Sequence, residues 1–199
     1  MKQLSIVFIT LLGLTACTPA SEKTEPVTEN PPVETVAESK PDLSDLINLY
    51  DLQSGLFAEV LSGISDEEAT QRMSENTNSV AWIAGHTVDI QYNIAMMLGI
   101  VQENPYAAQF GFGKPFDAAA SYPTLEKMQS DWNALTPQIK EAMSKLTTER
   151  LESGLPFQIP FAEQNLNGFL AFQMHHLGYE LGQLGLYRKF LGKEAMSYQ

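Results

Sequence analysis

Residues 167–191 constrain the fold most, because their spacing predicts a helix that is apolar on nearly every face. Between Glu163 and Arg188 the only formally charged side chain is Glu180. A helix that is apolar nearly all round is buried either in a bundle or in a membrane. The polar side chains along this helix favour the bundle: Gln173, His176, Glu180 and Gln183.

Three further segments show the helical spacing of apolar residues, and strand-type alternation is weak throughout the chain. These segments cover residues 43–63, 79–99 and 124–146. Together with the C-terminal segment they make four helices of similar length, which can bury their apolar faces against one another. The sequence therefore predicts an all-α protein that folds as a four-helix bundle.

Shorter signals mark the connections between these helices. Ser65 and Glu68 have the spacing of a capping box, which predicts a short helix after the first long one. Pro137 is expected to kink or split the third helix, because proline lacks a backbone donor and its ring clashes with the preceding turn. The stretch 103–123 is rich in Gly, Pro and Ala and is expected to be a long ordered connection that shapes the rim of a pocket.

The first 16 residues are typical of a secretory signal, with Lys2 at the start followed by an apolar stretch and small residues. The signal ends in LTAC, which resembles a bacterial lipobox, and Cys17 is the only cysteine in the chain. We expect lipidation of Cys17, which would anchor the mature protein to a membrane of the cell envelope. The alternative is an ordinary cleaved signal with an incidental cysteine. Thr18, rather than Asp, favours the outer membrane and its periplasmic face.

Composition divides the remaining chain into a tether and one domain. Residues 17–42 hold five prolines and no aromatic side chain, so they are expected to form an extended tether. Residues 43–193 are expected to form the bundle, followed by a short tail at 194–199. The chain carries a formal net charge of −12, which makes nucleic acid an unfavourable partner.

Glu180 needs a partner, because an unpaired carboxylate in an apolar helix is penalised by several kcal/mol. His176 lies one turn before it on the same face, and His86 stands on another nearly charge-free helix. These three side chains could form a facial site for Zn²⁺, Fe²⁺, Ni²⁺ or Mn²⁺. On spacing alone, an unrelated pair of core or surface histidines remains the alternative.

Two segments extend the argument beyond spacing: SVAWIAGHTVDIQYNIAMMLG, which contains Trp82 and His86, and HHLGYELGQLGLYRKFLGK, which contains His176. They resemble the two signature segments of the DinB/YfiT-like superfamily of small four-helix metalloproteins, and YPTLEKMQSDWNAL resembles its third helix. The resemblance implies that His86 and His176 are metal ligands. The family pattern has histidine at position 180, where this chain has Glu180.

That departure leaves three interpretations open. Glu180 can be the third ligand, His175 can compensate, or the site can have lost its metal. His175 lies about 100° round the helix from His176, toward a different neighbour, which disfavours it as a ligand. We therefore expect a site of His86, His176 and Glu180.

Relatives of known activity resemble metal-dependent enzymes that act with low-molecular-weight thiols, such as thiol S-transferases. The resemblance implies a metal-dependent transferase acting on a small molecule. A hydrolase is the equal alternative, because small thiols are mainly cytoplasmic. A non-catalytic envelope protein that binds a ligand without metal is the alternative of a different class. Tyr179, Gln183, Asp89 and Tyr92 can orient ligands or simply pack between helices, and a homodimer is left open.

Overall fold

The computed structural model describes residues 40–197. The expected signal segment, Cys17 and nearly all of the expected tether lie outside the described residues. Within the described part the secondary structure is helical, with one isolated bridge between Gly154 and Asn165. No helix in this part is long and apolar enough to cross a membrane.

Four long helices and three short ones follow one another along the chain. The long helices are α1 (Ser44–Leu61), α3 (Val80–Met97), α5 (Leu125–Ser144) and α7 (Leu166–Phe190). The short helices lie in the connections, and they are α2 (Asp66–Ala69), α4 (Ala107–Phe110) and α6 (Thr148–Glu152). The prediction of an all-α four-helix fold is confirmed.

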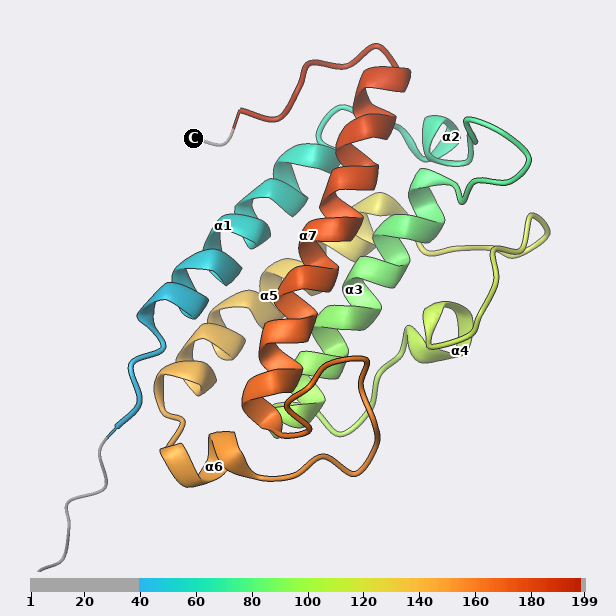
Figure 1. The fold of residues 1–199 in the computed structure, drawn as a ribbon. Helices are drawn as coiled ribbons and strands as arrows, with labels where there is room; N and C mark the ends of the chain where they lie inside the picture. Colours follow the sequence, from blue (N-terminus) through green and yellow to red (C-terminus); the bar gives the residue numbers. More distant parts are fainter. Residues whose placement is uncertain (1–39, 198–199) are drawn as a thin grey trace, which may run out of the picture. The chain divides into compact units, whose positions relative to one another are not determined.

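The long helices pack as a bundle in which each helix contacts two others. α7 lies between α1 and α3, and α5 packs against the same two helices from the other side (Figure 1). α3 and α5 run in the same direction and are joined by the long connection that contains α4 (Figure 1). The polar stripe of α7 can therefore meet α3 directly.

Local sequence signals explain where the helices begin. Ser79, Thr124 and Asn165 each accept a hydrogen bond from a backbone N–H in the first turn of the helix that follows. The capping box predicted at Ser65 and Glu68 is present, with both reciprocal hydrogen bonds formed. These caps fix the start of α3 and α7, and so fix which residues face each other between them.

Of the two effects expected of Pro137, a kink or a split, the split does not occur, since α5 continues from Leu125 to Ser144 with the proline inside it. Leu135 and Ile139, on either side of Pro137, are both buried in the core. Burial of an apolar face outweighs the loss of one intrahelical hydrogen bond.

A buried arginine joins the C-terminal end of α1 to α7. The Arg188 guanidinium donates hydrogen bonds to the carbonyl oxygens of Glu59, Val60 and Ser62 at 3.1, 3.0 and 2.6 Å. These carbonyls lie at the C-terminal end of α1, where the negative end of the helix dipole favours a cation. Arg188 thus holds the C-terminal end of α1 against the C-terminal end of α7.

Candidate metal centre

His86 has a fixed orientation on α3. Its Nδ1 lies 2.8 Å from the backbone carbonyl oxygen of Phe110, at the end of α4. A carbonyl can only accept a hydrogen bond, so Nδ1 carries the proton, and Nε2 of the neutral ring keeps its lone pair. The Trp82 indole stacks on the imidazole, with ring centroids 5.1 Å apart. The lone pair of His86 Nε2 therefore faces α7 and can ligate a metal ion.

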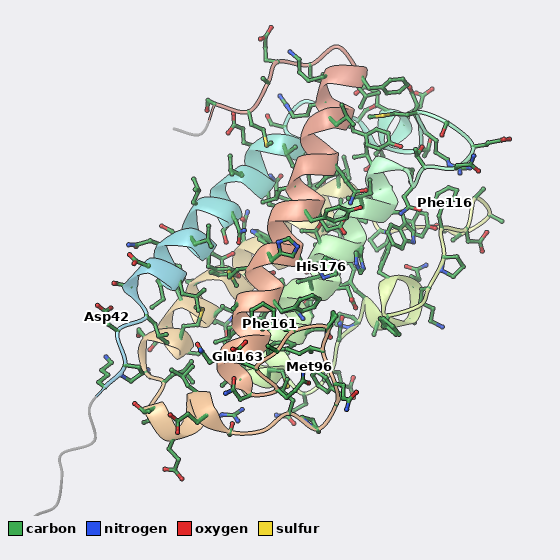
Figure 2. All side chains as sticks on the ribbon, in the orientation of Figure 1. Asp42, Met96, Phe116, Phe161, Glu163 and His176 are labelled. Atoms are coloured by element: carbon green, nitrogen blue, oxygen red, sulfur yellow. The ribbon has the colours of Figure 1, made fainter. Side chains whose placement is uncertain are left out.

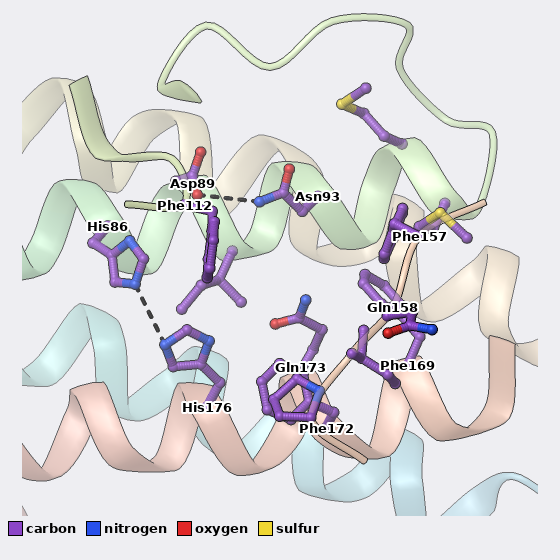
Figure 3. Close-up of a pocket in the computed structure, with 15 residues that line it drawn as sticks. His86, Asp89, Asn93, Phe112, Phe157, Gln158, Phe169, Phe172, Gln173 and His176 are labelled. Carbon is purple, nitrogen blue, oxygen red and sulfur yellow. Dashed lines mark hydrogen bonds between the residues drawn. The ribbon is translucent and has the colours of Figure 1, made fainter. Parts of the chain in front are cut away.

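His176 meets this nitrogen from α7 (Figures 2 and 3). Glu180 lies one turn later on the same helix. His176 Nε2 is 3.3 Å from His86 Nε2 and 3.4 Å from Glu180 Oε1. One ligand atom from each of the three side chains lies within 4.8 Å of the others. The structure thus brings together the three residues that the sequence indicated.

The Glu180 carboxylate is buried, with 4% of the residue exposed. Its Oε2 accepts a hydrogen bond of 2.7 Å from Gln183 Nε2, which leaves Oε1 toward His176. Among the described residues, His176 is the only basic side chain within 4 Å of the carboxylate. The carboxylate is held in place, and a cation at the imidazoles would balance its charge.

The residues present fit a divalent metal ion. Zinc lies about 2.0 to 2.2 Å from nitrogen and oxygen ligands, so ligand atoms in a tetrahedral site stand about 3.3 to 3.6 Å apart. The two measured separations, 3.3 and 3.4 Å, match that spacing. Two neutral imidazoles and a carboxylate also suit iron, nickel and manganese, and they leave coordination positions open. In metal-binding histidines the nitrogen that does not bind the metal usually donates its N–H to a carbonyl or carboxylate, as His86 Nδ1 does here.

Phe110 packs against α3 at a glycine that leaves room for its ring. A Cβ built on Gly85 would lie 2.2 to 2.7 Å from three atoms of the Phe110 ring, although both residues belong to well-packed helices. Phe110 itself is fully buried. The close approach places the Phe110 carbonyl beside His86, so Gly85 supports the orientation of a candidate ligand without contacting it.

Replacing Gly85 by alanine is expected to destabilise the protein, because Phe110 must move away from α3. Overpacking of this kind costs about 1 to 3 kcal/mol. The matched control is Gly55→Ala on α1, where an added Cβ meets nothing within 4 Å, so improved helix propensity should stabilise by about 0.5 to 1 kcal/mol. Urea unfolding of both variants measures the difference. A Gly85→Ala variant as stable as the Gly55→Ala variant would contradict this account.

Asp89 lies beside the candidate ligands, one turn after His86 on α3, and is 2% exposed. Asn104 Nδ2 donates to its Oδ1 at 2.7 Å, and Asn93 Nδ2 donates to its Oδ2 at 3.1 Å. Burial raises the pKa of the Asp89 carboxyl, while the hydrogen bonds from Asn104 and Asn93 oppose that rise. Asp89 is therefore fixed in position by the 98–124 connection, which supplies Asn104.

A cavity of about 520 Å³ opens between α3 and α7 next to the two histidines. His86, Asp89 and Asn93 line it from α3, and Gln173 and His176 line it from α7 (Figure 3). Glu180 does not line it, so the carboxylate lies behind the imidazoles as seen from the cavity. A small molecule in the cavity would meet the imidazoles first.

The other residues considered from the sequence have different surroundings. His175 is exposed and is not among the converging ligand atoms, as expected. Tyr179 is 61% exposed, which agrees with a surface position. Tyr92 stacks on Tyr106 and does not line the cavity. Of the four candidate orienting residues, Gln183 contacts a candidate ligand, and Asp89 lines the cavity.

Two contributors to the site had no signal in the sequence. The Phe110 carbonyl is a backbone atom, and no side-chain pattern marks it. Asn104 belongs to the irregular 98–124 connection, so helical spacing could not place it beside Asp89. The composition of that connection indicated only that it shapes a pocket rim, which the cavity-lining Phe112 bears out.

Comparison with solved structures finds the same fold in two bacterial proteins. A DinB-like protein from Bacillus cereus ATCC 10987 is 15% identical, with a TM-score of 0.57 over 76% of this chain and 94% of its own. A conserved protein from Enterococcus faecalis is 17% identical, with a TM-score of 0.55 over 78% of this chain and 100% of its own. At these identities the likeness shows the fold alone.

Comparison of sequences places the chain in a family. No curated protein matches it. The family model of the DinB superfamily matches residues 49–184, a segment that includes His86, His176 and Glu180. The match covers well over half of the chain, and the protein is thus a member of the DinB superfamily.

Proposed function

We propose that His86, His176 and Glu180 bind one divalent metal ion, zinc, nickel, iron or manganese, and that the protein is a metal-dependent transferase or hydrolase. The single observation that supports this most is the convergence of three ligand atoms at a buried site beside a cavity. The hydrogen bond from His86 Nδ1 to the Phe110 carbonyl adds to it, because it leaves the Nε2 lone pair free.

A divalent metal lowers the pKa of a coordinated water or thiol and so supplies a nucleophilic anion at neutral pH. The protein's own residues would prepare the site for that chemistry. Phe110 holds one imidazole and Gln183 holds the carboxylate, so the ligands need little rearrangement. The cavity would admit a small molecule on the imidazole side, where the reacting group would be held close to His86 and His176.

The proposal of an enzyme is tested by removing the metal. Protein treated with a chelator is expected to lose turnover of a panel of small esters, and of an electrophile offered with a small thiol, and to regain it with stoichiometric metal. Turnover of esters alone would assign a hydrolase, and thiol-dependent turnover a transferase. Activity that is unchanged by chelation, or absent from both panels with metal bound, would contradict the enzyme proposal.

A metal-free binding protein of the same fold is the second candidate. The observation that favours it is the position of His176 Nε2, within 3.3 Å of His86 Nε2 and 3.4 Å of Glu180 Oε1. A proton on this nitrogen could pair with either neighbour, which would satisfy the buried group without metal. The protein would then bind a ligand in the cavity and catalyse nothing, and it would retain its stability in the presence of chelator.

We also propose that lipidation of Cys17 attaches the protein to the cell envelope, on the periplasmic face of the outer membrane. Support comes from the sequence alone, namely the lipobox-like LTAC and the proline-rich stretch after it. In that location small thiols would be scarce, so the hydrolase is the favoured form of the enzyme. The acidic chain gives no support to a nucleic-acid partner, and a homodimer stays open.

A further inference from the structure

The cavity beside the candidate metal centre has mostly apolar walls. Its apolar lining residues from α3 are Ile90, Met96 and Met97. Those from α7 are Phe169 and Phe172, and the 153–165 connection adds Phe157 and Ile159. Figure 3 shows the three phenylalanines together at one end of the cavity. Phe112 of the 98–124 connection also lines it, although this residue is fully exposed to solvent. Apolar and aromatic walls with a few polar groups are typical of small-molecule sites.

The charges around the cavity act against an anionic ligand. None of the described residues that line it is a lysine or an arginine. Asp89 is the only carboxylate that the described part of the chain places in its wall, and the whole chain is strongly acidic. A carboxylate or sulfonate placed away from the two imidazoles would lose its hydration and find no cation. An uncharged apolar ligand does not have this cost of lost hydration.

One polar group in the wall lacks a partner. Gln173 is 7% exposed, and its Oε1 accepts no hydrogen bond from any described residue. Figure 3 shows its amide pointing from α7 into the space between the two helices. A buried acceptor without a donor is unfavourable. The oxygen is itself shielded from solvent, so a small rotation of the amide would bring it to an N–H or O–H of a ligand in the cavity.

We propose that this cavity binds the uncharged, apolar body of the substrate, aromatic or short alkyl, with one N–H or O–H group donating to Gln173. The reacting group would lie at His86 and His176, and only this last point rests on the proposed function. The substrate class would then exclude thiols or esters that carry several carboxylates, since the walls offer these groups no partner.

Two fluorescent probes with the same scaffold test the proposal on chelator-treated protein. N-phenyl-1-naphthylamine is uncharged and carries one N–H, and 1-anilinonaphthalene-8-sulfonate adds a single sulfonate. We expect the uncharged probe to bind with increased fluorescence, and the sulfonate to bind at least about tenfold more weakly. Equal affinity, or preference for the sulfonate, would overturn the proposal.

A charge placed in the wall locates the bound probe. Met96 lines the cavity and is 40% exposed, so Met96→Lys should fold and should narrow or reverse the preference against the sulfonate. Leu49→Lys is the matched control, because Leu49 is similarly exposed on α1 and does not line the cavity. Identical preferences in the two variants would show that the probe binds elsewhere, and melting curves verify that both are folded.

The hydrogen bond to Gln173 has its own control. Gln173→Leu is expected to weaken N-phenyl-1-naphthylamine about fivefold, because one neutral hydrogen bond is lost. The ether analogue 1-phenoxynaphthalene, used as a competitor, has no donor and should bind Gln173→Leu no more weakly than the unaltered protein. An equal loss for both ligands would overturn the role of Gln173.

These measurements need no metal, so they separate the two proposals. Probe binding with the expected preferences and no metal uptake would support the cavity assignment and contradict the metalloenzyme. Stoichiometric metal without probe binding would do the reverse.

Discussion

Replacing His176 by alanine is expected to lower the zinc affinity of the protein by on the order of 100-fold or more. Loss of an outer hydrogen-bond partner of a ligand already weakens metal binding by about 10- to 100-fold, and His176 would be a ligand itself. Its Nε2 lies 3.3 Å from His86 Nε2 and 3.4 Å from Glu180 Oε1, so its loss removes the atom that is close to both other candidate ligands. Competition with a chromogenic zinc chelator measures the change.

The adjacent residue provides a matched control. His175 is also a histidine on α7, but it is exposed and does not converge with the candidate ligands. His175→Ala should leave zinc affinity within about twofold, because surface changes away from a site have small effects. If both variants lost affinity equally, or if neither did, zinc would be bound elsewhere on the protein and the proposed centre would be wrong.

Replacing Cys17 by alanine is expected to move the protein from the membrane fraction to the soluble fraction. Each buried CH₂ of an acyl chain contributes about 0.8 kcal/mol to membrane binding, so loss of the lipid removes the attachment. No described helix could span a membrane in its place. Expression in a Gram-negative host, followed by detergent phase partition and labelling with radioactive palmitate, measures both attachment and modification.

The control for this experiment keeps the cysteine. Thr18→Ala changes the adjacent residue and leaves Cys17 intact, so the protein should still be labelled and stay in the detergent phase. Absence of label from the unaltered protein would contradict lipidation and would favour a simple cleaved signal.

The sequence predicted the fold well because the helices carry their own signals. Apolar spacing located the four long helices to within about two residues, and Ser65 with Glu68 marked the short α2. Pro137 does not split its helix because the local cost of the proline is set against tertiary burial of Leu135 and Ile139, which spacing alone does not weigh. Local propensity is a weaker influence than packing in such a case.

The side chains of the candidate site could be predicted from the sequence. The backbone and packing contacts that hold these side chains in place could not. His176 and Glu180 share a helical face, and the isolation of Glu180 in an apolar helix indicated that it needs a partner. That His86 faces them depends on the packing of α3 against α7. The Phe110 carbonyl and the Gly85 contact come from an irregular connection folding back onto α3, for which no periodic pattern exists.

The metal content of the unaltered protein tests the central claim most directly. Protein purified without a histidine tag and analysed by inductively coupled plasma mass spectrometry should contain about one zinc, nickel, iron or manganese ion per chain, as expected for a single site with three ligands. A chain that contains no stoichiometric metal, takes up none on dialysis, and has a melting temperature unaffected by Zn²⁺, Ni²⁺ and Mn²⁺ would contradict the account.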